Sequence, residues 1–183
     1  MQSVPLSLGT VYDLSSGTAT MLVTMPSVDR LDARILEIFA AEPRIGVLEC
    51  SRRLGVARGT VQARLDRLTA RGVVRGWGPE LDPAALGFTV TAFVTLEIRQ
   101  ARGHDAVAAH LTGIPEVLEV HTITGSGDLF ARVVARSNAD LQRVIDTVVA
   151  SDAIVRTSTV IALATQIPNR VLPLLAVAAD GRS

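Results

Sequence analysis

The amino-acid sequence predicts an α+β protein with an N-terminal helical bundle and a C-terminal domain whose elements run β-α-β-β-α-β. Apolar residues recur at helical spacing over the first half of the chain and alternate at strand spacing from residue 90 onward. The charge balance changes at the same place, because residues 27–78 hold ten arginines against six acidic residues, whereas residues 79–170 hold seven against ten. The chain therefore divides into a basic part and an acidic part.

Three short helices are predicted in the basic part. Apolar residues over 31–39 indicate the first helix, which has Asp29 or Asp32 available as N-cap and ends before Pro43. A second helix follows and ends at Gly55, since glycine best adopts the positive φ of a helix exit. The third helix starts directly afterwards, so the turn between the last two helices is tight.

The third helix, residues 57–71, has the pattern of a DNA-recognition helix. Val61, Leu65 and Leu68 form one narrow apolar stripe on an otherwise polar, arginine-rich helix, with small residues on the opposite face. A short strand predicted at 73–75 would then form a small wing. The basic part thus resembles a winged helix-turn-helix, and the structural alternative is a solvated arginine-rich helix that binds no nucleic acid.

Candidate contacts to double-stranded DNA follow from the chemistry of base edges and phosphates. Gln62 suits an adenine edge, Arg58 and Arg67 suit guanine or phosphate, and Thr60 lies near the helix N-terminus, where phosphates bind. The full set of candidates on this helix is Arg58, Gly59, Thr60, Gln62, Ala63, Arg64 and Arg67.

The acidic part predicts a ferredoxin-like domain. Strands are expected at 90–98, 117–123, 129–135 and 154–164, and helices at 105–111 and from Ser137 or Asn138 to about residue 149. In this arrangement the helices cover one face of the sheet only. The other face would expose Phe93, Phe130 and Val134, and because such a face rarely stays in water, we expect a homodimer through it.

A glycine-rich turn and the last strand are candidates for a small-molecule site. Residues 125–128 read Gly-Ser-Gly-Asp, whose backbone N–H groups and carboxylate match the two charged ends of an α-amino acid. Thr157 and Thr159 alternate onto one face of the last strand and would add hydroxyls. The simpler alternatives are a common hairpin turn and β-branched strand residues.

Composition excludes several other classes of protein. The 183 residues are 48% hydrophobic and 20% charged, all 18 basic residues are arginine, and the net charge is zero. Cys50 is alone and the three histidines lack metal-ligand spacing, so neither a disulfide nor a metal is expected. Catalytic elbows, phosphate-binding loops, signal peptides and membrane spans have no match. We expect a cytoplasmic protein without cofactor.

Domain boundaries follow from these patterns. Residues 1–26 have a Ser/Thr/Gly-rich composition and are interpreted as a tail, and the glycines and proline at 76–79 mark a junction. The expected parts are a tail at 1–26, the helix-turn-helix at 27–76, a linker strand or hinge at 77–88, the ferredoxin-like domain at 89–170 and a C-terminal tail at 171–183.

The segment from residue 29 to residue 170 resembles the Lrp/AsnC, or feast/famine, family of transcription regulators. The resemblance rests on the order of several short motifs: Leu31 to Leu36, Thr60 to Leu65, Gly72 to Gly76, Leu81-Asp82-Pro83, Val117 to Asp128 and Thr157-Ser158-Thr159. It implies DNA binding by the first domain, an effector, commonly an amino acid, bound by the second, and dimers that assemble into octamers or larger rings.

The resemblance assigns roles to particular positions. Thr60 and Arg64 match recognition-helix positions, and the effector-site positions are Gly125, Asp128, Thr157, Thr159 and Val160. The chain departs from the family at Ala57, where Ser is usual, and at Ser126 and Gly127, where Asp and an aromatic residue are usual.

Two alternative functions are compatible with this resemblance. The altered loop and missing cap favour a metabolite-sensing module without DNA binding. Siroheme decarboxylases resemble the same family, and for such an enzyme His121 and Arg132 would be the candidates, although the basic helix argues against it.

Overall fold

The computed structural model describes residues 28–99 and 103–180, so the expected N-terminal tail at 1–26 lies outside the described residues. The chain forms two compact units. Of the described residues, unit 1 contains those from Val28 to Gly78 together with those from Arg170 to Asp180, and unit 2 lies within Pro79–Asn169. Among the described residues, no helix combines the length and the hydropathy needed to cross a membrane.

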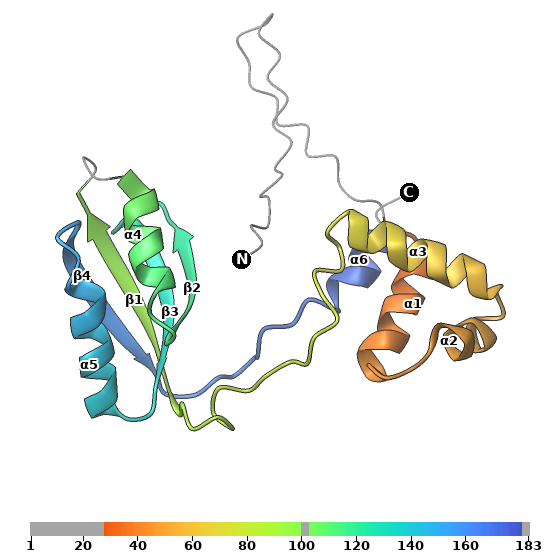
Figure 1. The fold of residues 1–183 in the computed structure, drawn as a ribbon, viewed down its shortest axis with the longest axis horizontal. Helices are drawn as coiled ribbons and strands as arrows, with labels where there is room; N and C mark the ends of the chain where they lie inside the picture. Colours follow the sequence, from red (N-terminus) through yellow and green to blue (C-terminus); the bar gives the residue numbers. More distant parts are fainter. Residues whose placement is uncertain (1–27, 100–102, 181–183) are drawn as a thin grey trace, which may run out of the picture. The chain divides into compact units, whose positions relative to one another are not determined.

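Unit 1 is built on the three predicted helices, α1 (Arg30–Ala41), α2 (Val47–Leu54) and α3 (Arg58–Ala70) (Figure 1). Asp29 is the N-cap of α1, and with Asp32 it forms a capping box in which each side chain accepts from the other's backbone N–H. Gly55 ends α2 with a φ of 67°, as predicted from its residue type.

The apolar stripes of the three helices meet in two small clusters. Ile35, Cys50, Val61 and Leu65 are buried together between α1, α2 and α3. Leu68 packs with Val28 and Ala33 in a second cluster, which Val73 and Val74 also contact. The two clusters together form the core of the helix-turn-helix.

The strand predicted for the wing at 73–75 is not formed, because backbone N–H groups of this segment donate hydrogen bonds to the last turn of α3. The backbone N–H groups of Val73 and Val74 both donate to the carbonyl of Leu68, at 2.9 and 3.2 Å. The two valine side chains then turn into the second cluster. Residues 77–88, expected as a linker strand or hinge, likewise contain no strand and include a turn over 83–87.

A short helix, α6 (Leu174–Asp180), occupies the segment expected to be a C-terminal tail. Leu175 and Ala179 pack against the cluster of Val28, Ala33 and Leu68, so α6 belongs to unit 1 and lies beside α1 (Figure 1). The sequence pattern does not predict this helix, because the apolar run is interrupted by Pro173 and is too short to show helical periodicity.

Unit 2 has the predicted β-α-β-β-α-β order. Its strands are β1 (Val90–Ile98), β2 (Val117–Thr122), β3 (Leu129–Ala135) and β4 (Ile154–Ala162), arranged antiparallel in the order β2-β3-β1-β4. The helices α4 (Gly103–Thr112) and α5 (Asn138–Val149) cover one face, and Ser137 caps α5 (Figure 1).

The core of unit 2 lies between this face and the helices. Ala92, Val94 and Leu96 of β1 are fully buried against α4 and α5. On the open face, Phe93 and Phe130 stack with ring centroids 5.5 Å apart and are half-buried. Val134, which was expected to be exposed beside them, is buried.

We predict that Leu175→Ala destabilises unit 1 by about 1–2 kcal/mol, because a partly buried leucine leaves its cluster. Urea unfolding followed by the fluorescence of Trp77, which packs edge-on against Phe39, measures the change. Val177→Ala removes a side chain that is 71% exposed on the same helix and should change stability by less than about 0.5 kcal/mol. Equal losses in the two variants would contradict the packing of α6 through Leu175.

Candidate DNA-binding helix and effector loop

The outward surface of α3 is formed by small and polar side chains. Val61, Leu65 and Leu68 are buried, and at about 100° per residue the opposite direction falls on Gly59 and Ala63. A Cβ atom added at Gly59 would meet no atom within 4 Å, so the surface there is open. Six of the seven candidate DNA contacts are exposed: Arg58, Gly59, Thr60, Gln62, Ala63 and Arg67.

Two of the candidate arginines are bonded to α1 instead of being directed outward. Arg64 Nη1 donates to Asp29 Oδ1 at 2.7 Å and to Asp32 Oδ1 at 2.8 Å. Arg67 Nη2 donates to both carboxylate oxygens of Asp32, at 2.8 and 2.6 Å. The carboxylate of Asp32 is fully buried, whereas Arg64 is 24% exposed and Arg67 41% exposed. Arg64 therefore holds α3 to α1, and only Arg67 keeps part of its surface for a phosphate.

These hydrogen bonds shift the pKa values of Asp29 and Arg64. Burial raises the pKa of Asp29, but the hydrogen bonds from Arg64 and from the Asp32 backbone N–H outweigh burial, so the pKa lies below its ordinary value of 3.8. The same bonds to Asp29 and Asp32 raise the pKa of Arg64. Sequence reasoning identified the cap but missed its arginine partners, because they lie 32 to 35 residues away.

The N-terminal end of α3 is open to an anion. Ala57 at the N-cap position has no side-chain oxygen, so no side-chain cap bonds the first-turn N–H groups. Arg58 and Thr60 lie in that turn and are exposed, and within the described residues Arg58 takes part in no ion pair. The Thr60 N–H donates to the Ala57 carbonyl at 3.0 Å, so the helix dipole, the N–H groups of Arg58 and Gly59 and the Arg58 guanidinium are what this end offers to an anion.

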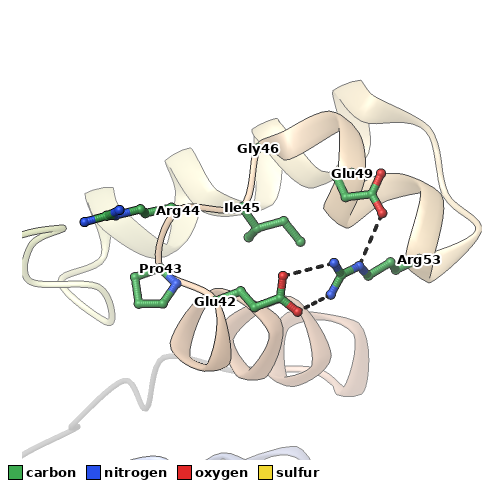
Figure 2. Close-up of a pocket in the computed structure, with 7 residues that line it drawn as sticks. All are labelled: Glu42, Pro43, Arg44, Ile45, Gly46, Glu49 and Arg53. Atoms are coloured by element: carbon green, nitrogen blue, oxygen red, sulfur yellow. Dashed lines mark hydrogen bonds and ion pairs between the residues drawn. The ribbon is translucent and has the colours of Figure 1, made fainter.

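A shallow groove beside the turn between α1 and α2 does not contain any predicted site residue. It has a volume of about 560 Å³, and Figure 2 shows Arg53 at its edge, bonded to Glu42 and Glu49. Both carboxylates that line the groove pair with this arginine. Its lining residues are Glu42, Pro43, Arg44, Ile45, Gly46, Glu49 and Arg53.

The glycine-rich turn is fastened to the end of β1. Asp128 donates its backbone N–H to the Leu96 carbonyl at 2.9 Å, and its Oδ2 accepts from the Ile98 N–H at 2.7 Å. The register of β1 and β4 shifts between Glu97 and Ile98, and the carboxylate bonds the N–H at this irregularity. Asp128, predicted to bind an ammonium, therefore has one oxygen committed to the backbone.

Glycine is required at two positions of this turn for different reasons. Gly125 has a φ of 113° but no atom within 4 Å of an added Cβ. Gly127 has a φ of 142°, and an added Cβ would clash with Thr95 Cγ2. The turn thus approaches β1 too closely for a larger residue, a requirement that the sequence alone did not reveal.

The predicted residues of β4 are divided between the two faces of the sheet. Thr157 pairs with Leu96 and Thr159 with Val94, so both threonines lie on the helix-covered face, where Thr157 is half-buried. Val160 pairs with Phe93 and lies on the open face, 64% exposed. Asp128 and Thr157 flank Leu96 from opposite sides, which brings the loop and the threonine to one end of the sheet.

His121 and Arg132, the candidates for an enzyme, lie on the open face, each within 4 Å of the carboxylate of Glu119. The Arg132 ion pair measures 3.0 Å and the His121 contact 3.7 Å. Both side chains thus lie against the carboxylate of the same residue, Glu119.

Comparisons with known proteins match both units. Residues 28–69 match the AsnC-type helix-turn-helix domain, and residues 91–172 match the Lrp/AsnC ligand binding domain. The regulatory protein AsnC of Escherichia coli is 30% identical over 147 residues, which cover 80% of this chain and 97% of that protein. The structure of E. coli AsnC covers 80% of this chain and 99% of its own, with a TM-score of 0.74.

Two similar structures contain an amino acid. One is the feast or famine regulatory protein from Mycobacterium tuberculosis complexed with L-methionine, 28% identical, with a TM-score of 0.70 over 79% of this chain and 97% of that one. The other is a transcriptional regulator/L-Met complex from Neisseria meningitidis, 25% identical, with a TM-score of 0.71 over 81% and 98%.

A helix-turn-helix joined to a β-α-β-β-α-β ligand-binding domain defines a DNA-binding transcriptional regulator, not an enzyme. The fold and the helices and strands of both units agree with that class. This chain belongs to the Lrp/AsnC family of transcriptional regulators.

We predict that unit 1 loses stability as the pH falls below about 4, in part through Asp29. Because the folded-state pKa of Asp29 is lower than the unfolded one, its contribution is complete above the unfolded value and is lost as the pH falls through the folded value. Urea unfolding followed by Trp77 fluorescence between pH 7 and pH 3 measures this loss. Asp29→Asn should be less stable at pH 7, and its free energy of unfolding should vary less with pH. A pH profile identical to that of the wild type would contradict the role of the carboxylate.

We predict that Gly127→Ala destabilises unit 2 by about 2–3 kcal/mol, because the new methyl group meets Thr95 and the backbone conformation is strained. Gly125→Ala is the matched control and should cost about 1 kcal/mol, since only its φ is unfavourable. Amide hydrogen exchange of β1 and β3 reports both changes. Equal effects would show that close packing against Thr95 is unimportant.

Proposed function

We propose that this regulator binds specific DNA sequences through α3 and that a small effector, an amino acid, alters its DNA affinity or its assembly. The observation that supports the proposal most strongly is the outward surface of α3, where small residues are flanked by exposed Arg58, Thr60 and Gln62. An α-helix of this kind fits the major groove of B-DNA and places donors against base edges.

The proposed DNA contacts divide by role. Arg58 and Thr60 bind phosphates at the open N-terminus of α3, and Gln62 contacts a base edge. Gly59 and Ala63 allow the backbone to approach the groove. Arg64 orients the helix through α1, and Arg67 contributes its exposed edge to the phosphate backbone.

The proposed effector site is the end of the sheet around Leu96. Gly125 and Asp128 supply the turn and one free carboxylate oxygen for an ammonium, and Thr157 supplies a hydroxyl. Thr159 extends that edge, whereas Val160 contributes to the opposite face. The complexes of two similar proteins with L-methionine support an amino acid as the ligand class.

We also propose that the protein acts in the cytoplasm as a homodimer, with dimers assembled into an octamer or another ring. The stacked Phe93 and Phe130 and the exposed Val160 form an apolar strip on the open face of the sheet, which a second copy would cover. A two-fold dimer also presents two copies of α3 to a DNA site with two half-sites.

We predict that the protein binds the DNA upstream of its own gene more tightly than random DNA and that affinity falls steeply with salt, because phosphate contacts release counterions. Fluorescence anisotropy at several salt concentrations measures both effects. Arg58→Ala should weaken binding and reduce the slope of log K against log salt by about one. Arg44 is an exposed arginine outside α3, so Arg44→Ala should change neither the affinity nor the slope of log K against log salt.

The effector is tested in the same assay with single L-amino acids, methionine among them. A ligand that shifts the titration should lose its effect in Thr157→Val, which removes a hydroxyl and keeps the shape. Equal and weak binding to both DNAs would instead favour the metabolite-sensing module without DNA binding.

A further inference from the structure

A hydrogen-bonded glutamine–aspartate pair lies on the exposed surface of α3. Gln62 Nε2 donates to Asp66 Oδ1 at 2.8 Å, one helical turn apart, and both residues are exposed. Asp66 is the one acidic residue in the sequence of α3, which otherwise carries three arginines. A negative charge on a helix that meets DNA requires an explanation, because it opposes phosphate binding.

The arginines of α3 leave this carboxylate unneutralised. At about 100° per residue, Gln62 and Asp66 lie on one side of the outward stripe of Gly59 and Ala63, and Arg64 and Arg67 lie on the other. Arg64 and Arg67 are bonded to the carboxylates of α1. Within the part of the chain that the structure describes, Asp66 is hydrogen-bonded to Gln62 and takes part in no ion pair. The carboxylate of Asp66 therefore lies on the outward surface of the helix without a cationic partner among the described residues.

The major groove contains groups that such a carboxylate favours. Cytosine presents its N4 amino group and adenine its N6 amino group, and both donate hydrogen bonds, whereas guanine and thymine present carbonyl oxygens in the equivalent position. A carboxylate accepts a hydrogen bond from the amino group of cytosine or adenine, whereas it repels the carbonyl oxygen of guanine or thymine. The hydrogen bond from Gln62 also fixes its amide, so that its oxygen and its second N–H are already oriented before DNA binds.

We propose, on the basis of the DNA-binding function above, that Asp66 determines sequence specificity by orienting Gln62 and by restricting the base under this pair to cytosine or adenine. The exclusion of guanine and thymine comes from the charge of Asp66, and the orientation of Gln62 comes from the hydrogen bond. The negative charge of Asp66 also weakens binding to the DNA phosphates, and this loss of affinity accompanies the gain in base discrimination.

The experiment selects binding sites from random double-stranded DNA with the full-length protein and with three variants, then measures affinities by anisotropy. Asp66→Asn removes the charge, and Asp66→Glu keeps it on a longer side chain. Asp146→Asn is the matched control, because Gln142 Nε2 donates to Asp146 Oδ1 at the same 2.8 Å on α5 of unit 2. Trp77 fluorescence in urea verifies that unit 1 is folded in each variant, and amide hydrogen exchange of β1 and β3 verifies the same for unit 2.

The expected result is a change at one base position in each half-site. Asp66→Asn should reduce the preference for cytosine or adenine over guanine and thymine there by about tenfold and bind random DNA more tightly. Asp66→Glu should retain the preference, and Asp146→Asn should match the wild type.

Two outcomes overturn the proposal, and they are distinguishable. If the wild type selects a motif and Asp66→Asn selects the same motif with uniformly tighter binding, Asp66 acts on phosphates alone and only this inference fails. If the wild type selects no motif at all, both sequence-specific DNA binding and the role of Asp66 are wrong.

Discussion

The orientation of α3 depends on one buried carboxylate. Asp32 lies in the first turn of α1, closes the capping box with Asp29 and accepts hydrogen bonds from Arg64 and Arg67 of α3. A buried charge is tolerated only when it is paired, and removing its partners costs about 3–5 kcal/mol. The pairing, together with the burial of Val61, Leu65 and Leu68, therefore fixes the rotation of α3 about its own axis. That rotation decides which side chains meet solvent, so the candidate DNA surface on Arg58, Thr60 and Gln62 is a consequence of an ion pair behind it.

A comparable constraint organises unit 2 around the end of β1. Asp128 bonds the backbone of β1 on one side, and Thr157 of β4 pairs with Leu96 on the other. Gly127 lets the turn lie directly against Thr95. Because the sheet core above it is fully buried, the loop and the threonine have little freedom to move apart, and a ligand held by both would be sensitive to any change in the strand between them.

Much of this fold could be predicted from local sequence patterns, and the candidate sites only in part. The exit of α2 at Gly55, the cap of α5 at Ser137 and strand β3 at Leu129–Ala135 follow from signals within a few residues. The partners of Arg64 and Arg67 could not be predicted, since periodicity says which face a residue occupies and not which distant carboxylate it meets. The predicted wing failed for a similar reason: residues 73–75 have the composition of a strand, but their N–H groups are used to end α3.

The place of α6 in unit 1 has a consequence for biosynthesis. Unit 2 lies between the two segments of unit 1 along the chain, so α6 leaves the ribosome after every strand of the sheet. Until then, the surface of Val28, Ala33 and Leu68 lacks the cover that Leu175 and Ala179 provide. The nascent helix-turn-helix is therefore less stable than the finished one, and a chain that loses its last residues to a protease would keep an intact sheet while carrying a weakened DNA-binding unit.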